Sequence, residues 1–111
     1  MKKAALVILA LTLALPLSAE TWKNVSLMDA SCAGKPAALS TPDTHTRACA
    51  LKCAKAGYGA VVDGKFVKFD EKGSDLAKAA LMKSEKSDHL KATVSGELKD
   101  GVIHVSSLTL N

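Results

Sequence analysis

Hydrophobic and polar positions alternate with a period of two in several parts of the chain, and this alternation predicts β-strands. Residues 22–28 form the first predicted strand, although its alternation is weak. Residues 58–62 and 65–69 form a predicted hairpin, because Asp63-Gly64 between them is typical of a type I′ turn, in which both central residues have positive φ.

A second hairpin is predicted for residues 90–98 and 102–110, again around an Asp-Gly pair. The apolar positions of its second strand change parity between Val105 and Leu108. That change requires either a β-bulge or burial on both faces of the sheet. Gly96 in the partner strand is typical of a bulge or a sharp bend.

Two helices are predicted from capping residues and from the spacing of apolar positions. The first spans about residues 44–56, with Thr41 or Thr44 as its cap. The second spans about residues 75–83 and begins after Ser74, which can act as its cap.

The order of these elements predicts an α+β fold built on a small five-stranded, OB-like β-barrel. The first helix and the loop before it, which is rich in Ala, Ser, Gly and Pro, form an insertion at about residues 29–57, after the first strand. The second, short helix lies between strands three and four, as in the OB-fold. A generic α+β sheet is the alternative.

The beginning of the chain predicts export. A basic start (MKK) is followed by an apolar run at residues 4–15 and by small residues that end at Ala19, which is the order found in signal peptides. The apolar run is shorter than the ~20 residues that a membrane span needs. We therefore expect residues 1–19 to be a cleaved signal peptide, and residues 20–111 to be a single periplasmic or secreted domain with no stable membrane span.

Charge and composition exclude some functions and leave others open. The net charge is only +4, and half of it belongs to the predicted signal peptide. The lysines are dispersed, so a nucleic-acid partner is not expected. Acidic residues show no paired spacing of the kind used in acid–base catalysis, and the pattern does not favour an enzyme. We expect Arg47 to be a solvated helix charge.

Thiols and one imidazole give the chain its most specific pattern. His45, Cys49 and Cys53 are spaced i, i+4, i+8, which places them on one stripe of a helix. Cys32 lies upstream in the predicted loop, which could fold back. Three thiols and an imidazole form a Cys₃His set, suited to zinc or another soft or borderline transition metal.

Helix geometry restricts this predicted metal site. Residues 45 to 53 of a straight helix span ~12 Å, whereas two ligands of one tetrahedral ion lie roughly 4 Å apart. The complete set therefore requires His45 to lie in a non-helical segment before the helix. Otherwise the ligands are Cys32, Cys49 and Cys53, or Cys49 with His45 and Cys32.

Two other interpretations of the cysteines remain open. Thiols of exported proteins tend to pair, so Cys32 could form a disulfide with Cys49 or Cys53 and leave one free thiol. The protein would then be a disulfide-stapled module that binds a protein or glycan, without metal. A thiol redox protein acting through Cys49 or Cys53 is the third interpretation, although the CxxC pair typical of such proteins is absent from the sequence.

The motif DxxC…HxxxCAxxCxxxG, formed here by Asp29, Cys32, His45, Cys49 and Cys53 with Gly57 at its end, resembles a group of small exported bacterial proteins that have an OB-like β-barrel. The resemblance covers most of residues 20–111 and implies an exported location and a grouping of Cys32 with the three later residues. It implies no activity. This chain departs from the group by placing Ala33 directly after Cys32, where the group has Gly.

Overall fold

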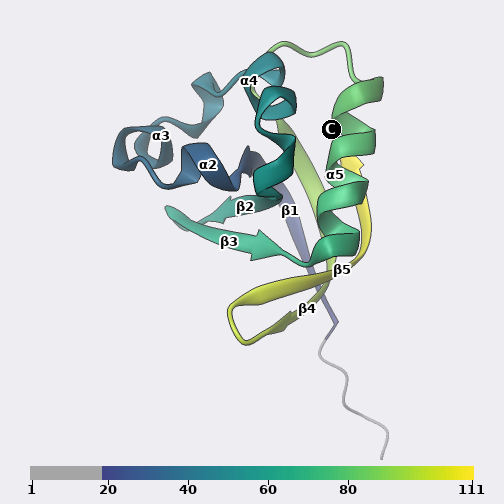
Figure 1. The fold of residues 1–111 in the computed structure, drawn as a ribbon. Coiled ribbons are helices and arrows are strands. Elements are labelled where there is room, and N and C mark those ends of the chain that lie inside the picture. The colour runs from purple at the N-terminus through teal and green to yellow at the C-terminus, as the bar shows by residue number, and fades with distance from the viewer. Residues whose placement is uncertain (1–18) are drawn as a thin grey trace, which may run out of the picture.

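A computed structural model describes residues 19–111 of the chain. Residues 1–18, which carry most of the predicted signal peptide, lie outside the described residues. The described part contains five β-strands, four α-helices and two short 3₁₀ helices (Figure 1). In chain order they are β1 (Glu20–Asp29), α2 (Ala30–Ala33), α3 (Pro36–Ser40), η2 (Pro42–Thr44), α4 (Arg47–Lys52), η3 (Ala54–Ala56), β2 (Tyr58–Val62), β3 (Lys65–Phe69), α5 (Glu71–Lys83), β4 (Lys91–Lys99) and β5 (Val102–Leu110).

The five strands form one mixed sheet that closes into a ring in the order β1-β2-β3-β5-β4. β1 pairs with both β2 and β4, and every pairing is antiparallel except the short parallel one between β3 and β5. The predicted α+β class is therefore confirmed, as are the five strands and a helix between strands three and four. The ring surrounds an apolar core to which every strand contributes.

Both predicted hairpin turns are confirmed. Asp63 and Gly64 have φ values of 51° and 79°, and Asp100 and Gly101 have values of 55° and 78°. Positive φ at both central residues is the requirement of a type I′ turn, which glycine meets without steric cost. Short local sequence signals therefore determine where each hairpin reverses.

A bulge in the second hairpin reconciles the change of parity seen in the sequence. Ser95 pairs with Ser107 and Gly96 pairs with Val105, so Ser106 has no partner of its own in β4. A Cβ atom at Gly96 would collide with the carbonyl oxygen of His104, and only glycine fits there. The predicted bulge is confirmed.

Helix α5 begins earlier than predicted and closes over β5. Asp70 is its N-cap, with a side chain that accepts a 2.9 Å hydrogen bond from the Gly73 amide. The prediction that Ser74 caps this helix is therefore wrong. The Ser74 hydroxyl instead accepts a 3.0 Å hydrogen bond from the Tyr58 amide. Gly73 is tolerated inside the helix because its bare backbone packs against Val105, where a Cβ would clash.

Candidate metal site

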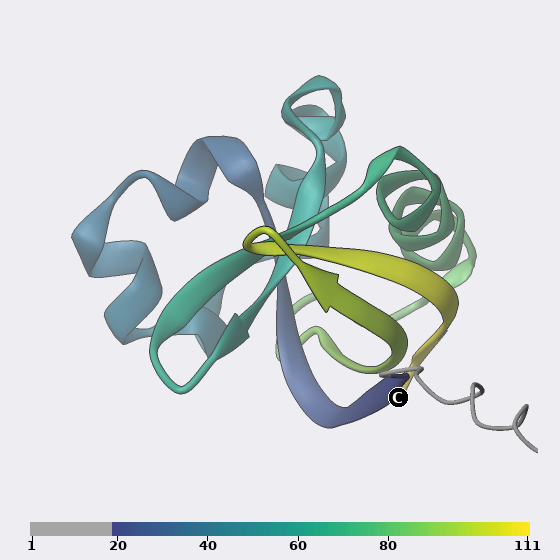
Figure 2. The same ribbon diagram turned by 90° about the horizontal axis from the view of Figure 1, so that it is seen from below.

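The residues between β1 and β2, 30–57, form a helical insertion in which all the candidate ligands except Asp29 lie. In Figures 1 and 2, α2 and α3 project from one side of the sheet, whereas α5 lies on the other side. The loop predicted before residue 43 instead contains α2 and α3, and α3 begins at Pro36, which is suited to a first helical turn. The helix predicted for residues 44–56 is also wrong in extent, because Thr46 is the N-cap and the α-helix ends at Lys52.

Asp29 connects the sheet to this insertion. It is the last residue of β1, is fully buried, and is the N-cap of α2. Its Oδ2 atom accepts a 2.9 Å hydrogen bond from the Cys32 amide, so the carboxylate is held in one orientation. Our sequence analysis did not propose Asp29 as a ligand. Its position before a short helix was a capping signal, but only the fold reveals the burial of its side chain.

His45 lies opposite Asp29 in a non-helical segment. Its φ and ψ are −68° and 128°, so it is extended between η2 and α4, which is the condition under which the sequence allowed it to join a site with Cys32. Its side chain is only 7% exposed, and its Nε2 atom lies 2.8 Å from Asp29 Oδ1. The two atoms nevertheless lack hydrogen-bond alignment, and within the described chain neither has another hydrogen-bond partner.

The Cys32 side chain completes a compact cluster with these two residues. One donor atom each from Asp29, Cys32 and His45 lie within 4.8 Å of one another. Two oxygen or nitrogen ligands of a tetrahedral zinc ion lie ~3.3 Å apart, because each bond is roughly 2.0–2.1 Å long. The cluster could therefore hold a metal ion after the Asp29–His45 pair separates by about half an ångström.

The other two cysteines lie outside this cluster, and all three thiols are free. Cys49 is exposed on α4, and its amide donates a 3.1 Å hydrogen bond to Thr46 Oγ1. Cys53 is half-buried at the junction of α4 and η3. The structure therefore brings together two of the four ligands predicted from the sequence, Cys32 and His45, and places Asp29 beside them.

The environment of Cys32 favours its neutral form. Burial raises the pKa of the Cys32 thiol above its usual value, and the negative charges of Asp29 and of an ionised Cys53 raise this pKa further. The reactive form of cysteine is the thiolate, so a raised pKa disfavours Cys32 as a redox nucleophile at neutral pH. A bound cation would reverse this effect, because metals bind cysteine as the thiolate.

Two side chains fasten α4 to the rest of the fold. The buried Tyr58 hydroxyl donates a 2.7 Å hydrogen bond to the Ala50 carbonyl. Arg47 Nε donates a 2.6 Å hydrogen bond to the Leu81 carbonyl, and its terminal nitrogen donates to the Met82 carbonyl at 3.1 Å. Arg47 is therefore not the solvated charge that we expected, because it binds carbonyl groups at the C-terminal end of α5.

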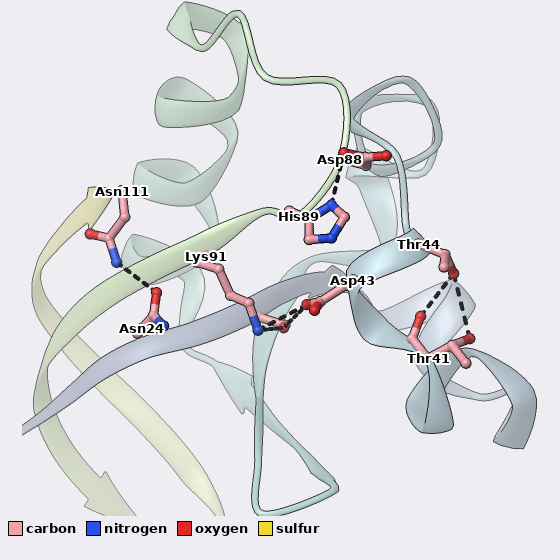
Figure 3. Close-up of polar contacts among 9 residues, drawn as sticks. Asn24, Thr41, Asp43, Thr44, Asp88, His89, Lys91 and Asn111 are labelled. Carbon is pink, nitrogen blue, oxygen red and sulfur yellow. Dashed lines mark hydrogen bonds and ion pairs between the residues drawn. The ribbon is translucent and has the colours of Figure 1, made fainter.

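A polar network fastens η2, directly before His45. Lys91 Nζ lies 2.8 Å from Asp43 Oδ1 and donates a 3.1 Å hydrogen bond to Ser26 Oγ (Figure 3). The hydrogen bond from Lys91 holds the pKa of Asp43 below its usual range. The His89 amide also donates to the Asp43 carbonyl at 3.0 Å. Asp43, two residues before His45, is therefore held by contacts with side chains of β1 and β4, and these contacts help to position His45.

Comparison of the chain with models of known protein families, with characterised proteins and with solved structures finds no match.

Proposed function

We propose that this protein is a small exported metal-binding domain, in which Asp29, Cys32 and His45 hold zinc or another borderline transition metal. One observation carries the proposal. Asp29 Oδ1 and His45 Nε2 are buried side by side without an aligned hydrogen bond, and the Cys32 donor atom lies within 4.8 Å of both. Buried polar atoms are nearly always satisfied, and those that are not call for a specific explanation.

A cation explains this arrangement better than burial alone. A fully buried carboxylate is costly unless it is paired or coordinates a metal. Oxygen, nitrogen and thiolate donors together suit zinc, whereas magnesium and calcium prefer oxygen alone. The hydrogen bond from the Cys32 amide to Asp29 Oδ2 is the kind of outer contact that orients a ligating carboxylate.

A tetrahedral ion needs a fourth donor, and we propose Cys53 for it. The hydrogen bond between the Ala30 amide and the Gly57 carbonyl, 2.9 Å long, holds the start of α2 beside the end of η3. Cys53 therefore lies near Cys32, consistent with the effect of its charge on the Cys32 pKa. Cys49, the other predicted ligand, is exposed and is the outermost of the candidates. The site would serve to stabilise the insertion or to handle metal.

The scaffold and the location belong to the same proposal. The strand order β1-β2-β3-β5-β4 and the position of α5 support an OB-like barrel. The basic and apolar start of the chain supports export to the periplasm or beyond. Within residues 19–111, no helix is long and apolar enough to span a membrane.

Metal binding can be tested with the protein expressed from its full sequence and purified under reducing conditions without chelator. We expect bound metal that His45→Ala removes and that His89→Ala retains, since His89 is an exposed imidazole outside the cluster. Metal content measured by atomic emission decides the outcome. If zinc titration shows no saturable binding, or if the two histidine variants bind equally, the proposed function is wrong.

A further inference from the structure

Cys32 and Cys53 lie in or beside short helical segments of the insertion. Cys32 lies in α2, a helix of four residues that packs mainly on α3 and β1. Cys53 is the residue at which α4 ends and η3 begins, with φ and ψ of −102° and 26°. Neither residue is in the interior of a long helix or in the sheet, so both can shift without disturbing the ring of strands.

The backbone holds these two residues on the same side of the fold. The Ala30 amide donates a hydrogen bond to the Gly57 carbonyl, and Cys32 and Cys53 lie two and four residues from that contact. Cys49 lies one helical turn farther from it and is exposed, whereas the other two cysteines are both half-buried. The structure therefore distinguishes one pair of thiols from the third.

From this arrangement we propose that Cys32 and Cys53 are the site of a disulfide that competes with the metal, so that oxidation of the pair releases the ion. The inference rests on the proposed function, because it adds regulation to the same site. Metal binding and disulfide formation use the same Cys32 sulfur. The two states are therefore mutually exclusive, and Asp29 with His45 would be left as a two-donor remnant with much weaker affinity.

The chemistry requires an oxidant, and a low-molecular-weight disulfide supplies it. The Cys53 sulfur attacks one sulfur of the oxidant, which forms a mixed disulfide and releases a first thiolate. Cys32 then attacks the Cys53 sulfur, releases a second thiolate and closes the Cys32–Cys53 bond. Two electrons pass from the two cysteines to the oxidant, any proton on Cys53 goes to a leaving thiolate, and the metal ion departs with its charge unchanged.

Disulfide oxidants are typical of the compartments outside the cytoplasm to which we assign this protein. Cys53 is the attacking residue because it lies at the junction of α4 and η3, where it can leave the ion while the Asp29, Cys32 and His45 cluster stays bound. A metal that stays bound protects Cys32, so the protein would keep its ion until the oxidant outcompetes it.

The test uses reduced protein of the full sequence, saturated with zinc and then treated with oxidised glutathione. Zinc content is measured before the oxidant is added, released zinc is followed with a chromophoric chelator, and disulfides are mapped by peptide mass spectrometry. Cys53→Ser is the test variant, and since it also removes the proposed fourth donor, zinc release from each protein is measured with and without the oxidant. Cys49→Ser is its matched control, because it removes the thiol that lies one helical turn earlier.

We expect oxidised glutathione to accelerate zinc release from wild type and Cys49→Ser equally, in step with a Cys32–Cys53 disulfide, and to accelerate it roughly tenfold less in Cys53→Ser. Equal acceleration in Cys53→Ser, a disulfide that includes Cys49, or a Cys32–Cys53 disulfide with zinc still bound would each overturn the inference. Failure of the wild-type protein to bind zinc before oxidation would instead overturn the proposed function, so the two failures are distinguishable.

Discussion

The ring of strands and the helical insertion between β1 and β2 are stabilised by different kinds of contact. The ring encloses aliphatic and aromatic side chains such as Leu27, Phe69 and Ile103, each no more than 1% exposed. The insertion contributes few large buried side chains, and hydrogen bonds of Asp29 and Arg47 hold it in place. The difference implies that the ring can fold without metal, whereas the insertion gains rigidity when a cation joins its polar groups.

The largest expected effect is on the ring. Phe69→Ala removes a fully buried aromatic side chain from the core of the sheet, and we expect the free energy of unfolding to fall by about 3–5 kcal/mol. Chemical denaturation followed by circular dichroism measures it, with the half-exposed Leu98→Ala as a near-neutral control. Zinc affinity of the folded fraction should be unchanged. A parallel loss of affinity would show that the ring and the insertion are not separable.

Asp29→Asn should weaken zinc binding and leave the stability of the metal-free protein unchanged. Asparagine caps a helix as well as aspartate does, so α2 and the overall stability without metal should be retained. Removing the charge from the buried pair should weaken zinc binding by at least ~100-fold, the upper end of the losses seen when outer-shell partners are removed. Competition with a chelator of known affinity measures the change. An affinity within about threefold of wild type would remove Asp29 from the site.

Arg47→Ala tests whether α4 is fastened through the C-terminal carbonyls of α5. The loss of two hydrogen bonds from a charged group should lower the free energy of unfolding by about 1–2 kcal/mol. The variant should also increase the rate of amide hydrogen exchange more in α4 than in β4. Lys52→Ala, an exposed charge on the same helix, serves as the control and should change stability little.

Tyr58→Phe has the smallest expected effect, about 1 kcal/mol, because it removes a single buried hydrogen bond. Its pH dependence adds a second readout. Burial raises the pKa of Tyr58 above its usual value of 10.0, so the unfolded chain ionises first as the pH rises. Wild-type stability should therefore decline above pH 10, while the variant lacks this contribution. Denaturation midpoints between pH 8 and pH 11 measure the narrowing difference, and parallel curves would contradict it.

The ring of strands was predicted from the sequence more accurately than the helical insertion. Alternation and Asp63-Gly64 are local signals, because a strand and its turn depend on neighbouring residues, and the strands and turns of the ring were predicted accordingly. In the insertion, prolines and Thr46 divide a predicted helix and loop into short pieces. The capping potential of Thr46 is readable in the sequence, but it competes with that of Thr41 and Thr44.

The candidate site was only half predictable for a related reason. Cys32 and His45 could be selected by residue type, since thiols and imidazoles are frequent metal ligands. Asp29 could not be selected in this way, because acidic residues are common and its burial depends on how β1, β2 and the insertion pack together. Helical spacing favoured Cys49, and the exposure of its side chain on α4 became visible only in the fold.

A cobalt titration of the reduced protein tests the central claim most directly, because thiolate ligation produces a charge-transfer absorption band. We predict saturable binding with this band in wild type and in Cys49→Ser, a clearly weaker band in Cys32→Ser, and loss of tight binding in His45→Ala. The absence of saturable binding, or a band that is undiminished in Cys32→Ser and disappears in Cys49→Ser, would contradict a metal site built from Asp29, Cys32 and His45.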